Sequence, residues 1–198
     1  MYKGDEYSGI IGDYLEIVSQ ETGIEFKPIP NITWEESLNK LKTGEIKFVP
    51  SCAITEQREK FLVFTDNIVS DPLVIATRKD AGFISSLEYL EGQTIALPKN
   101  YYTLEMIRKD FPKINIIEKS SIQECLKSVS TGEAEAFFGS LGVISYYINS
   151  KGFTNLKIAS PTRYDDVQIS MACTKDWVEF RDIINKACLL YTSDAADD

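Results

Sequence analysis

The sequence contains no histidine, and its acidic residues outnumber its basic ones, 30 to 21. Histidine is the commonest metal ligand and general base, so we expect no metal site, no cofactor and no histidine-based catalysis. The net charge of −9, without a run of basic residues, argues against nucleic acid and anionic membranes as partners. No run of about 18 apolar residues occurs, so no transmembrane helix is predicted within residues 1–198.

Cysteine is also scarce, and no two of the four cysteines form a C-x-x-C pair. A zinc or redox motif is therefore not predicted. We interpret Cys52, Cys125, Cys173 and Cys188 as small buried apolar side chains, with a Cys52–Cys173 disulfide as the alternative. The 198 residues, 43% hydrophobic and 26% charged, suffice for one large globular domain or two small lobes.

The most informative stretch that is present lies at residues 47–66. It joins a short apolar strand to a loop of small residues, Ser51, Cys52 and Ala53. Thr55 is placed to cap a short helix that carries Arg58. Backbone N–H groups at a helix start favour an anion, and a guanidinium group can bind a carboxylate through two hydrogen bonds. The stretch therefore predicts a carboxylate receptor, with a surface arginine on an exposed turn as the alternative.

Part of this stretch, residues 54–66, closely resembles a segment of bacterial extracellular solute-binding proteins of the family 3 type. It reads Ile-Thr-Glu-Gln-Arg-Glu-Lys-Phe-Leu-Val-Phe-Thr-Asp. The resemblance extends over about residues 4–187. It implies an α/β fold of two lobes, periplasmic-binding-protein-like (type 2), with a ligand cleft between the lobes. In that family the arginine of the T-x-x-R pattern binds the ligand carboxylate, which assigns this role to Arg58.

The resemblance also implies how the chain is divided. Residues 1–74 would begin lobe one, residues 75–168 would form lobe two, and residues 169–190 would return to lobe one. Strands at residues 73–77 and 168–173 would cross between the lobes. The family has an opening strand ahead of the segment at residues 4–13, and this first strand is expected to be missing. Residues 191–198 break the preceding helical pattern and resemble a non-native tail.

Helical and strand patterns alternate along the chain, as in α/β lobes. We expect helices at residues 14–22, with Asp13 as the cap, and at 34–42, 104–110, 121–132, 141–150 and 177–190. We expect strands at residues 24–29, 46–49, 73–77, 94–97, 114–118, 134–138, 156–159 and 168–173.

Two more strand ends are candidates for the ligand site, because ligands bind beyond the carboxyl ends of strands in open α/β sheets. One opens a helix at residues 98–103 and, by the resemblance, contributes Asn100, Tyr101, Tyr102 and Thr103. The other ends at Ser140, where amino-acid-binding members usually have an aspartate that pairs with the ligand ammonium. We therefore expect a carboxylate ligand without an essential ammonium group, unless another acid such as Asp13 or Asp165 replaces that partner.

Three functions are compatible with these features. Residues 139–148 look like binding domains fused to sensor kinases and cyclic-dinucleotide enzymes, which favours a non-catalytic, periplasmic sensory domain with fused transmembrane and output domains. The alternative is a free binding protein that delivers amino acids to an ABC permease. The third is a cyclohexadienyl dehydratase, which needs an acidic proton donor. The strand-end loops offer only Glu56, so we expect no enzyme.

Overall fold

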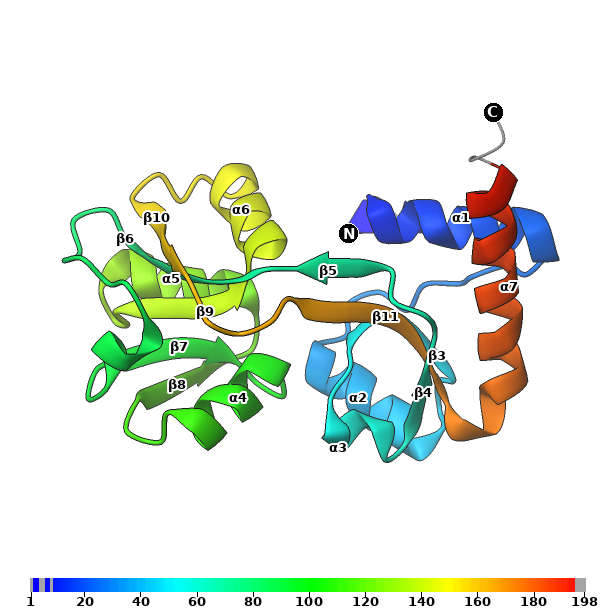
Figure 1. Cartoon of the computed structure of the whole chain (residues 1–198), viewed down its shortest axis with the longest axis horizontal. Helices are drawn as coiled ribbons and strands as arrows, with labels where there is room; N and C mark the ends of the chain where they lie inside the picture. The colour runs from blue at the N-terminus through cyan, green and yellow to red at the C-terminus, as the bar shows by residue number, and fades with distance from the viewer. Residues whose placement is uncertain (1, 4–5, 8, 195–198) are drawn as a thin grey trace. The chain divides into compact units, whose positions relative to one another are not determined.

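The computed structural model describes the backbone of residues 2–3, 6–7 and 9–194 and the side chains of residues 9–189. The chain divides into two compact units (Figure 1). The first consists of Met1–Ile32, Glu36–Val69 and Gln168–Asp198, and the second of Thr33–Glu35 and Ser70–Val167. Apart from the short segment Thr33–Glu35, the chain therefore enters the second unit near residue 70 and leaves it near residue 167.

The second unit is built on a five-stranded sheet with the order β10-β6-β9-β7-β8. β7 pairs in parallel with β8 and β9, whereas β6 pairs antiparallel with β9 and β10. The strands are β6 (Leu73–Arg78), β7 (Thr94–Pro98), β8 (Asn115–Lys119), β9 (Ala136–Ser140) and β10 (Leu156–Pro161).

Three helices connect these strands and pack against the sheet: α4 (Tyr102–Asp110), α5 (Ile122–Thr131) and α6 (Leu141–Ser150) (Figure 1). A 3₁₀ turn at Leu87–Leu90 precedes β7. The central strands are buried on both faces, since every residue of β9 and all but one of β6 and of β7 are buried. Their near-continuous apolar sequences follow from this two-sided burial.

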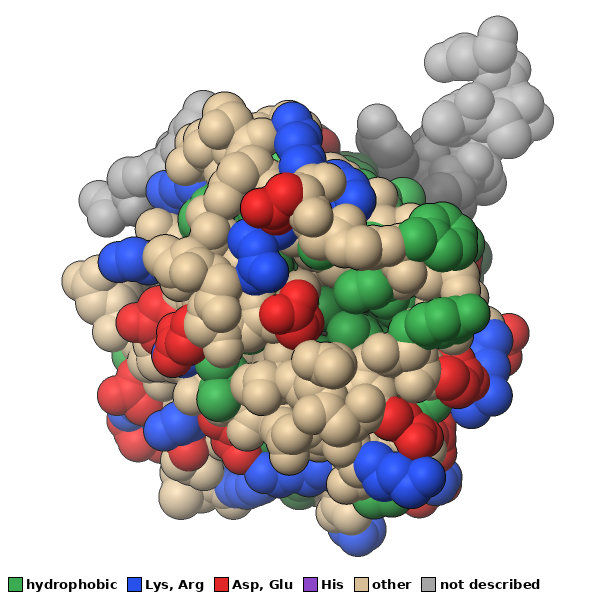
Figure 2. Space-filling view, turned by 90° about the vertical axis from the view of Figure 1, so that its left-hand side faces the viewer, with side chains coloured by type: hydrophobic (Ala, Val, Ile, Leu, Met, Phe, Trp, Pro, Cys, Tyr) green, Lys and Arg blue, Asp and Glu red, His purple; other side chains and the backbone are tan. Residues whose placement is uncertain are grey.

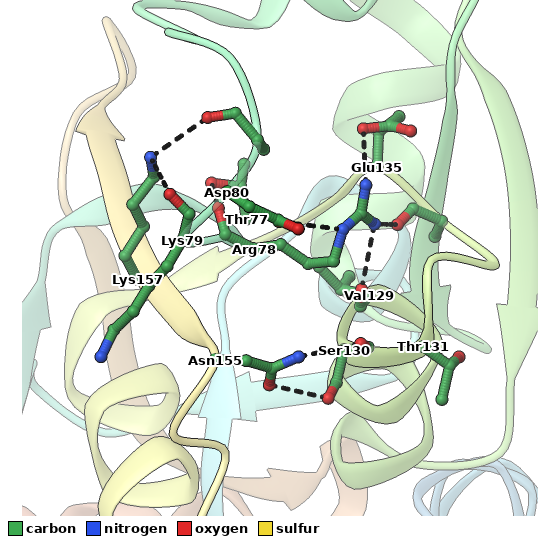
Figure 3. A network of polar contacts seen from close by, with 12 residues as sticks. Thr77, Arg78, Lys79, Asp80, Val129, Ser130, Thr131, Glu135, Asn155 and Lys157 are labelled. Carbon is green, nitrogen blue, oxygen red and sulfur yellow. Dashed lines mark hydrogen bonds and ion pairs between the residues drawn. The ribbon is translucent and has the colours of Figure 1, made fainter.

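Arg78, at the end of β6, contacts the end of α5, the segment that precedes β9 and the turn after β6 (Figure 3). Its Nη1 donates to the carbonyl oxygens of Val129 and Ala134, at 3.2 and 3.3 Å. Its Nη2 lies 3.5 Å from the Glu135 carboxylate, and its Nε lies 3.4 Å from that of Asp80. The Val129 carbonyl belongs to the last turn of α5 and also accepts the amide hydrogen of Gly132 at 3.1 Å, so Arg78 adds a second hydrogen bond at that helix end.

The first unit contains a smaller sheet with the order β3-β11-β4, in which both outer strands pair antiparallel with β11. These strands are β3 (Phe48–Ala53), β4 (Leu62–Phe64) and β11 (Val167–Thr174), and β5 (Val69–Asp71) also pairs with β11. Two short strands, β1 (Tyr2–Lys3) and β2 (Glu6–Tyr7), form a separate antiparallel pair.

The core of the first unit lies where α1 (Ile10–Thr22) and α7 (Val178–Asp194) pack together beside β11. It is formed by Leu15, Val18, Met171, Ile184 and Ala187. The 3₁₀ turn Lys175–Trp177 leads into α7. Two further helices, α2 (Trp34–Thr43) and α3 (Glu56–Glu59), flank β3 in the sequence.

The predicted α/β fold is confirmed, and the ends of several helices follow local sequence rules. Gly23 and Gly132 follow α1 and α5 in left-handed conformations, at φ 72° and 80°, which glycine adopts without strain. The Ser121 hydroxyl accepts the amide hydrogen of Glu124, as its capping box predicts. The helices expected at residues 34–42, 104–110 and 141–150 are present within two residues.

Four local predictions are wrong. Residues 24–29 form no strand, although their side chains alternate in exposure. β6 lies wholly within the sheet of the second unit and so does not cross between units. Asp13 lies inside α1, which begins after Gly9. α7 continues to Asp194, because residues 191–194 include neither glycine nor proline to end it.

The alternative of a Cys52–Cys173 disulfide is also wrong, since all four cysteines are free. The strand register explains this: Cys52 lies opposite Ser170 of β11, whereas Cys173 lies opposite Phe48.

None of the described helices is long and apolar enough to cross a membrane. Within the described part of the chain, no cluster of three His, Cys, Asp or Glu side chains could hold a metal ion. On the face of the second unit in Figure 2, acidic and basic side chains are interspersed around a smaller hydrophobic area. This mixture gives that face no field of one sign.

Candidate functional site

The candidate site in the first unit begins where β3 ends. Cys52 and Ala53 are 2% and 3% exposed, whereas Ser51, just before them, is exposed. The Thr55 hydroxyl accepts the amide hydrogen of Arg58 at 3.3 Å and caps α3, as predicted from the sequence. The β3–α3 turn therefore fixes the backbone from which the Arg58 side chain extends.

The Arg58 side chain folds back over this turn and is only 3% exposed. Its Nη1 donates to the Ala53 carbonyl oxygen at 2.8 Å and lies 3.8 Å from the Cys52 Sγ. The alternative of a surface arginine is therefore wrong. A buried guanidinium group is costly unless its positive charge is compensated and its N–H groups are hydrogen-bonded, and the Ala53 carbonyl oxygen accepts one of these hydrogen bonds.

The Cys52 thiol adjoins this cation. Burial raises the pKa of the thiol, and the positive charge and hydrogen bond of Arg58 partly offset that rise. A raised pKa keeps the thiol protonated and neutral at pH 7. The thiol therefore contributes no negative charge beside Arg58.

The second candidate segment lies at the β7–α4 junction of the second unit. Asn100 adopts a left-handed conformation at φ 57°, which asparagine tolerates better than most residues. Tyr101 precedes α4 and its ring stacks against that of Tyr102, with 6.1 Å between the ring centroids. Thr103 is 1% exposed, and its hydroxyl has no hydrogen-bond partner among the residues that the structure describes. Tyr102 is buried at 9% exposure, so Tyr101 is the more exposed aromatic of the pair.

Ser140, the third candidate, ends β9 and caps α6. Its hydroxyl accepts the amide hydrogen of Val143 at 3.4 Å and donates to Oδ2 of Asp71 at 2.5 Å. The Asp71 carboxylate also accepts the amide hydrogen of Gly142, at 3.1 and 3.2 Å from its two oxygens. A Cβ atom at position 142 would lie 2.9 Å from Asp71 Oδ2, so glycine is needed there for this approach.

Asp71 is the residue that the sequence analysis missed. The sequence predicts no negative charge at the Ser140 position, with Asp13 or Asp165 as substitutes. Asp71 instead supplies a carboxylate directly beside Ser140, from a position 69 residues earlier in the chain. The one sequence signal for it is Gly142, whose missing side chain leaves room for Asp71 at the start of α6.

The predicted ligand-binding residues thus lie in two sets, one in each unit. Ser51, Cys52, Ala53, Thr55 and Arg58 lie together at the β3–α3 turn of the first unit. Asn100, Tyr101, Tyr102 and Thr103 lie at the start of α4 in the second unit, and Ser140 lies at the start of α6. Each group stands at the carboxyl end of a strand, where α/β sheets place ligands.

The fold and these strand-end groups are those of a two-lobed solute-binding domain. The profile of the bacterial extracellular solute-binding proteins, family 3, matches residues 1–195, and the chain belongs to this family. The expectation drawn from residues 54–66 is therefore confirmed.

One relative is the virulence sensor protein BvgS of Bordetella pertussis, 29% identical over 98% of this chain and 16% of that protein. The chain thus spans about a sixth of the length of this sensor. A glutamine-binding protein of Geobacillus stearothermophilus is 26% identical over 61% of this chain and 45% of that protein. Among solved structures, the periplasmic VFT2 domain of BvgS from B. pertussis matches with a TM-score of 0.84 and 29% identity, over 96% of this chain and 81% of that domain.

Proposed function

We propose that this chain is a non-catalytic, periplasmic sensory domain that binds a small carboxylate and belongs to a membrane-bound signalling protein. The observation that carries the proposal is the burial of Arg58 at the end of β3. Sensor proteins among the relatives, matched over nearly the whole chain, support the sensory role.

The carboxylate preference rests on the chemistry around Arg58. Its Nη1 is oriented by the Ala53 carbonyl oxygen, and the neighbouring Cys52 thiol stays neutral. A ligand carboxylate would accept hydrogen bonds from the guanidinium fork in two-point geometry. Its negative charge would also pair with the positive charge of the buried guanidinium group.

The site residues of the second unit refine the ligand class. Asp71 places a negative charge beside Ser140, so an ammonium group could be compensated there after all. An α-amino acid and a simple carboxylate both fit this chemistry, and the relatives include a glutamine-binding protein. We therefore keep both classes, amino acids and other small carboxylates, as the proposed ligands.

A thermal-shift panel tests this proposal. The panel compares proteinogenic amino acids, their deaminated analogues, and simple mono- and dicarboxylates, with uncharged amides as controls. A ligand at about 100 times its dissociation constant should stabilise the protein by roughly 2.7 kcal/mol, which for a chain of this size raises the melting temperature by roughly 5–10 °C. Shifts caused by the amides and not by the carboxylates would contradict the role proposed for Arg58.

The second candidate function is a free binding protein that serves an ABC permease, and the glutamine-binding relative favours it. The full-length coding sequence distinguishes the two. A transmembrane segment and an output domain joined to this chain support a sensor, whereas a leader peptide followed by this domain alone supports transport.

Catalysis is the third candidate. Glu56, the one acid that the sequence analysis could offer for a dehydratase, is exposed on α3, where water surrounds it. Incubation with prephenate, followed by detection of phenylpyruvate, should give no product. Product formation that Glu56→Gln abolishes would overturn the assignment as a binding domain.

A further inference from the structure

Trp34 stands apart from most of its helix. It begins α2, yet the segment Thr33–Glu35 is grouped with the second unit, whereas Ile32 and Glu36 on either side belong to the first. The Trp34 side chain is half-buried. The partners that the structure shows for this side chain, Asn100 and Tyr101, also lie in the second unit.

Trp34 contacts the β7–α4 turn through both its N–H group and its ring. Its Nε1 donates to the Asn100 carbonyl oxygen at 3.1 Å. Its ring meets the Tyr101 ring edge-on, with 6.2 Å between the centroids and 68° between the planes, a geometry that aromatic pairs favour. Tyr101 in turn stacks on Tyr102, the first residue of α4. Trp34 therefore joins the two tyrosine rings in a row that ends at the start of α4.

The backbone that Trp34 contacts includes a residue in the left-handed conformation. The Tyr101 N–H donates to the Pro98 carbonyl oxygen at 3.4 Å, which closes a β-turn over residues 98–101. Asn100 is the third residue of this turn and has φ 57°. Glycine fills such a position without strain, whereas asparagine is tolerated there at some cost. The turn therefore gains from a contact that holds the Asn100 carbonyl oxygen in place.

The conformation of this turn decides where α4 begins. α4 starts at Tyr102, directly after the turn, and the Leu104 N–H donates to the Tyr101 carbonyl oxygen at 3.1 Å. Thr103 is 1% exposed, and its hydroxyl has no partner among the described residues. The amino end of a helix favours an anion. A displaced turn would carry the Thr103 hydroxyl and this helix start away from a carboxylate bound there.

We propose that Trp34 is a positioning residue of the ligand site, which holds the β7–α4 turn in the conformation that presents Thr103 and the start of α4 to a carboxylate. The inference rests on the function proposed above for this turn. The indole N–H is a donor only and is usually paired in folded proteins. The hydrogen bond to Asn100 therefore uses the polar group that tryptophan has and phenylalanine lacks.

The matched pair Trp34→Phe and Trp177→Phe tests the proposal. Trp177 is the other tryptophan of the chain, and its ring meets that of Phe180 edge-on at 5.1 Å in the first unit. Both changes keep an aromatic ring and remove an indole N–H. The readout is amide hydrogen exchange at Tyr101 and Leu104, whose N–H groups are hydrogen-bonded in the turn and at the start of α4. No carboxylate is present.

Trp34→Phe should speed exchange at these two amides about three- to tenfold, the effect expected from the loss of one neutral hydrogen bond. Amides of α5, in the same unit, should exchange as before, which separates a local effect on the turn from a loss of overall stability. Trp177→Phe should leave all of these amides unchanged.

Asn100→Gly provides the rescue. Because glycine takes a positive φ without strain, the turn should then depend less on Trp34. In the double variant Trp34→Phe/Asn100→Gly, exchange at Tyr101 and Leu104 should return to within about twofold of the unchanged chain. A tryptophan that served only to cover apolar surface would give no such rescue.

Calorimetry with two probes, L-glutamine and succinate, measures the consequence for binding. A probe that binds the unchanged chain should bind Trp34→Phe about three- to tenfold more weakly and Trp177→Phe equally well. Binding of neither probe would count against the proposed ligand classes. The role of Trp34 would still be decided by hydrogen exchange, which is measured without a ligand.

Three results would overturn the proposal. In the first, Tyr101 and Leu104 exchange at the same rate in Trp34→Phe as in the unchanged chain. In the second, the amides of α5 are accelerated as much as these two, which would make Trp34 a residue of general stability. In the third, Asn100→Gly restores no protection, or a probe that binds the unchanged chain binds Trp34→Phe with equal affinity.

Discussion

The contact between Ser140 and Asp71 gives a prediction whose size follows from the structure. Ser140→Ala removes two interactions, the cap on the Val143 amide and the short hydrogen bond to the Asp71 carboxylate. A cap contributes about 1 kcal/mol, and a hydrogen bond to a charged group contributes roughly 1.5–3 kcal/mol. The expected loss of unfolding free energy is therefore roughly 2–4 kcal/mol.

Ser121→Ala is the matched control for this change. The Ser121 hydroxyl caps α5 by accepting the Glu124 amide hydrogen at 3.2 Å, so its loss should cost only about 1 kcal/mol. Urea unfolding of both variants measures the difference. A double-mutant cycle with Asp71→Ala should then give a coupling of about 1 kcal/mol or more. Equal losses in the two serine variants, together with additivity in the cycle, would refute the argument that Asp71 and Ser140 act as a unit.

Two further predictions concern Arg78, which is half-buried, and Cys125, which is fully buried. Arg78→Lys should lower the unfolding free energy by roughly 2 kcal/mol or more, because a lysine ammonium group cannot reproduce the planar guanidinium group that hydrogen-bonds the Val129 and Ala134 carbonyls. The control is Arg163→Lys, at a side chain that is 65% exposed. This change should alter the unfolding free energy little in the same urea assay. Burial raises the pKa of Cys125 to about 12, from an ordinary value of 9.0. Between these pH values the folded thiol keeps its proton while the unfolded thiol loses it, so stability should fall as pH rises, by up to about 1.4 kcal/mol per pH unit. Cys125→Ala should flatten the slope of unfolding free energy against pH over this window by that amount, and an unchanged slope would show that Cys125 does not titrate as described.

Local sequence signals predicted the β3–α3 turn well. Thr55 lies three residues before Arg58, so the hydroxyl and the amide that it caps are set by helix geometry alone. The glycines at positions 23 and 132 end their helices for a similarly local reason. Patterns of this kind depend on a few consecutive residues, and the rest of the fold need not be known.

What the sequence did not predict depends on distant partners. Asp71 reaches Ser140 only because β6 and β9 pair, with Leu73 opposite Ser140, and no local pattern encodes that register. Residues 24–29 have the alternation of a strand, but a strand also needs a neighbour to pair with. The crossing segment was misplaced for a related reason, since an apolar run such as β6 fits a buried central strand equally well.

The central claim is that Arg58 binds a carboxylate, and calorimetry tests it most directly. The strongest ligand from the thermal-shift panel is titrated into the unchanged chain, into Arg58→Ala and into Arg108→Ala, whose side chain is 60% exposed and pairs with Glu118 on the surface. Removing one partner of a buried charge pair costs roughly 2–5 kcal/mol. The account predicts that Arg58→Ala weakens binding at least about 30-fold while Arg108→Ala leaves it unchanged. Equal affinity in all three proteins would contradict the account.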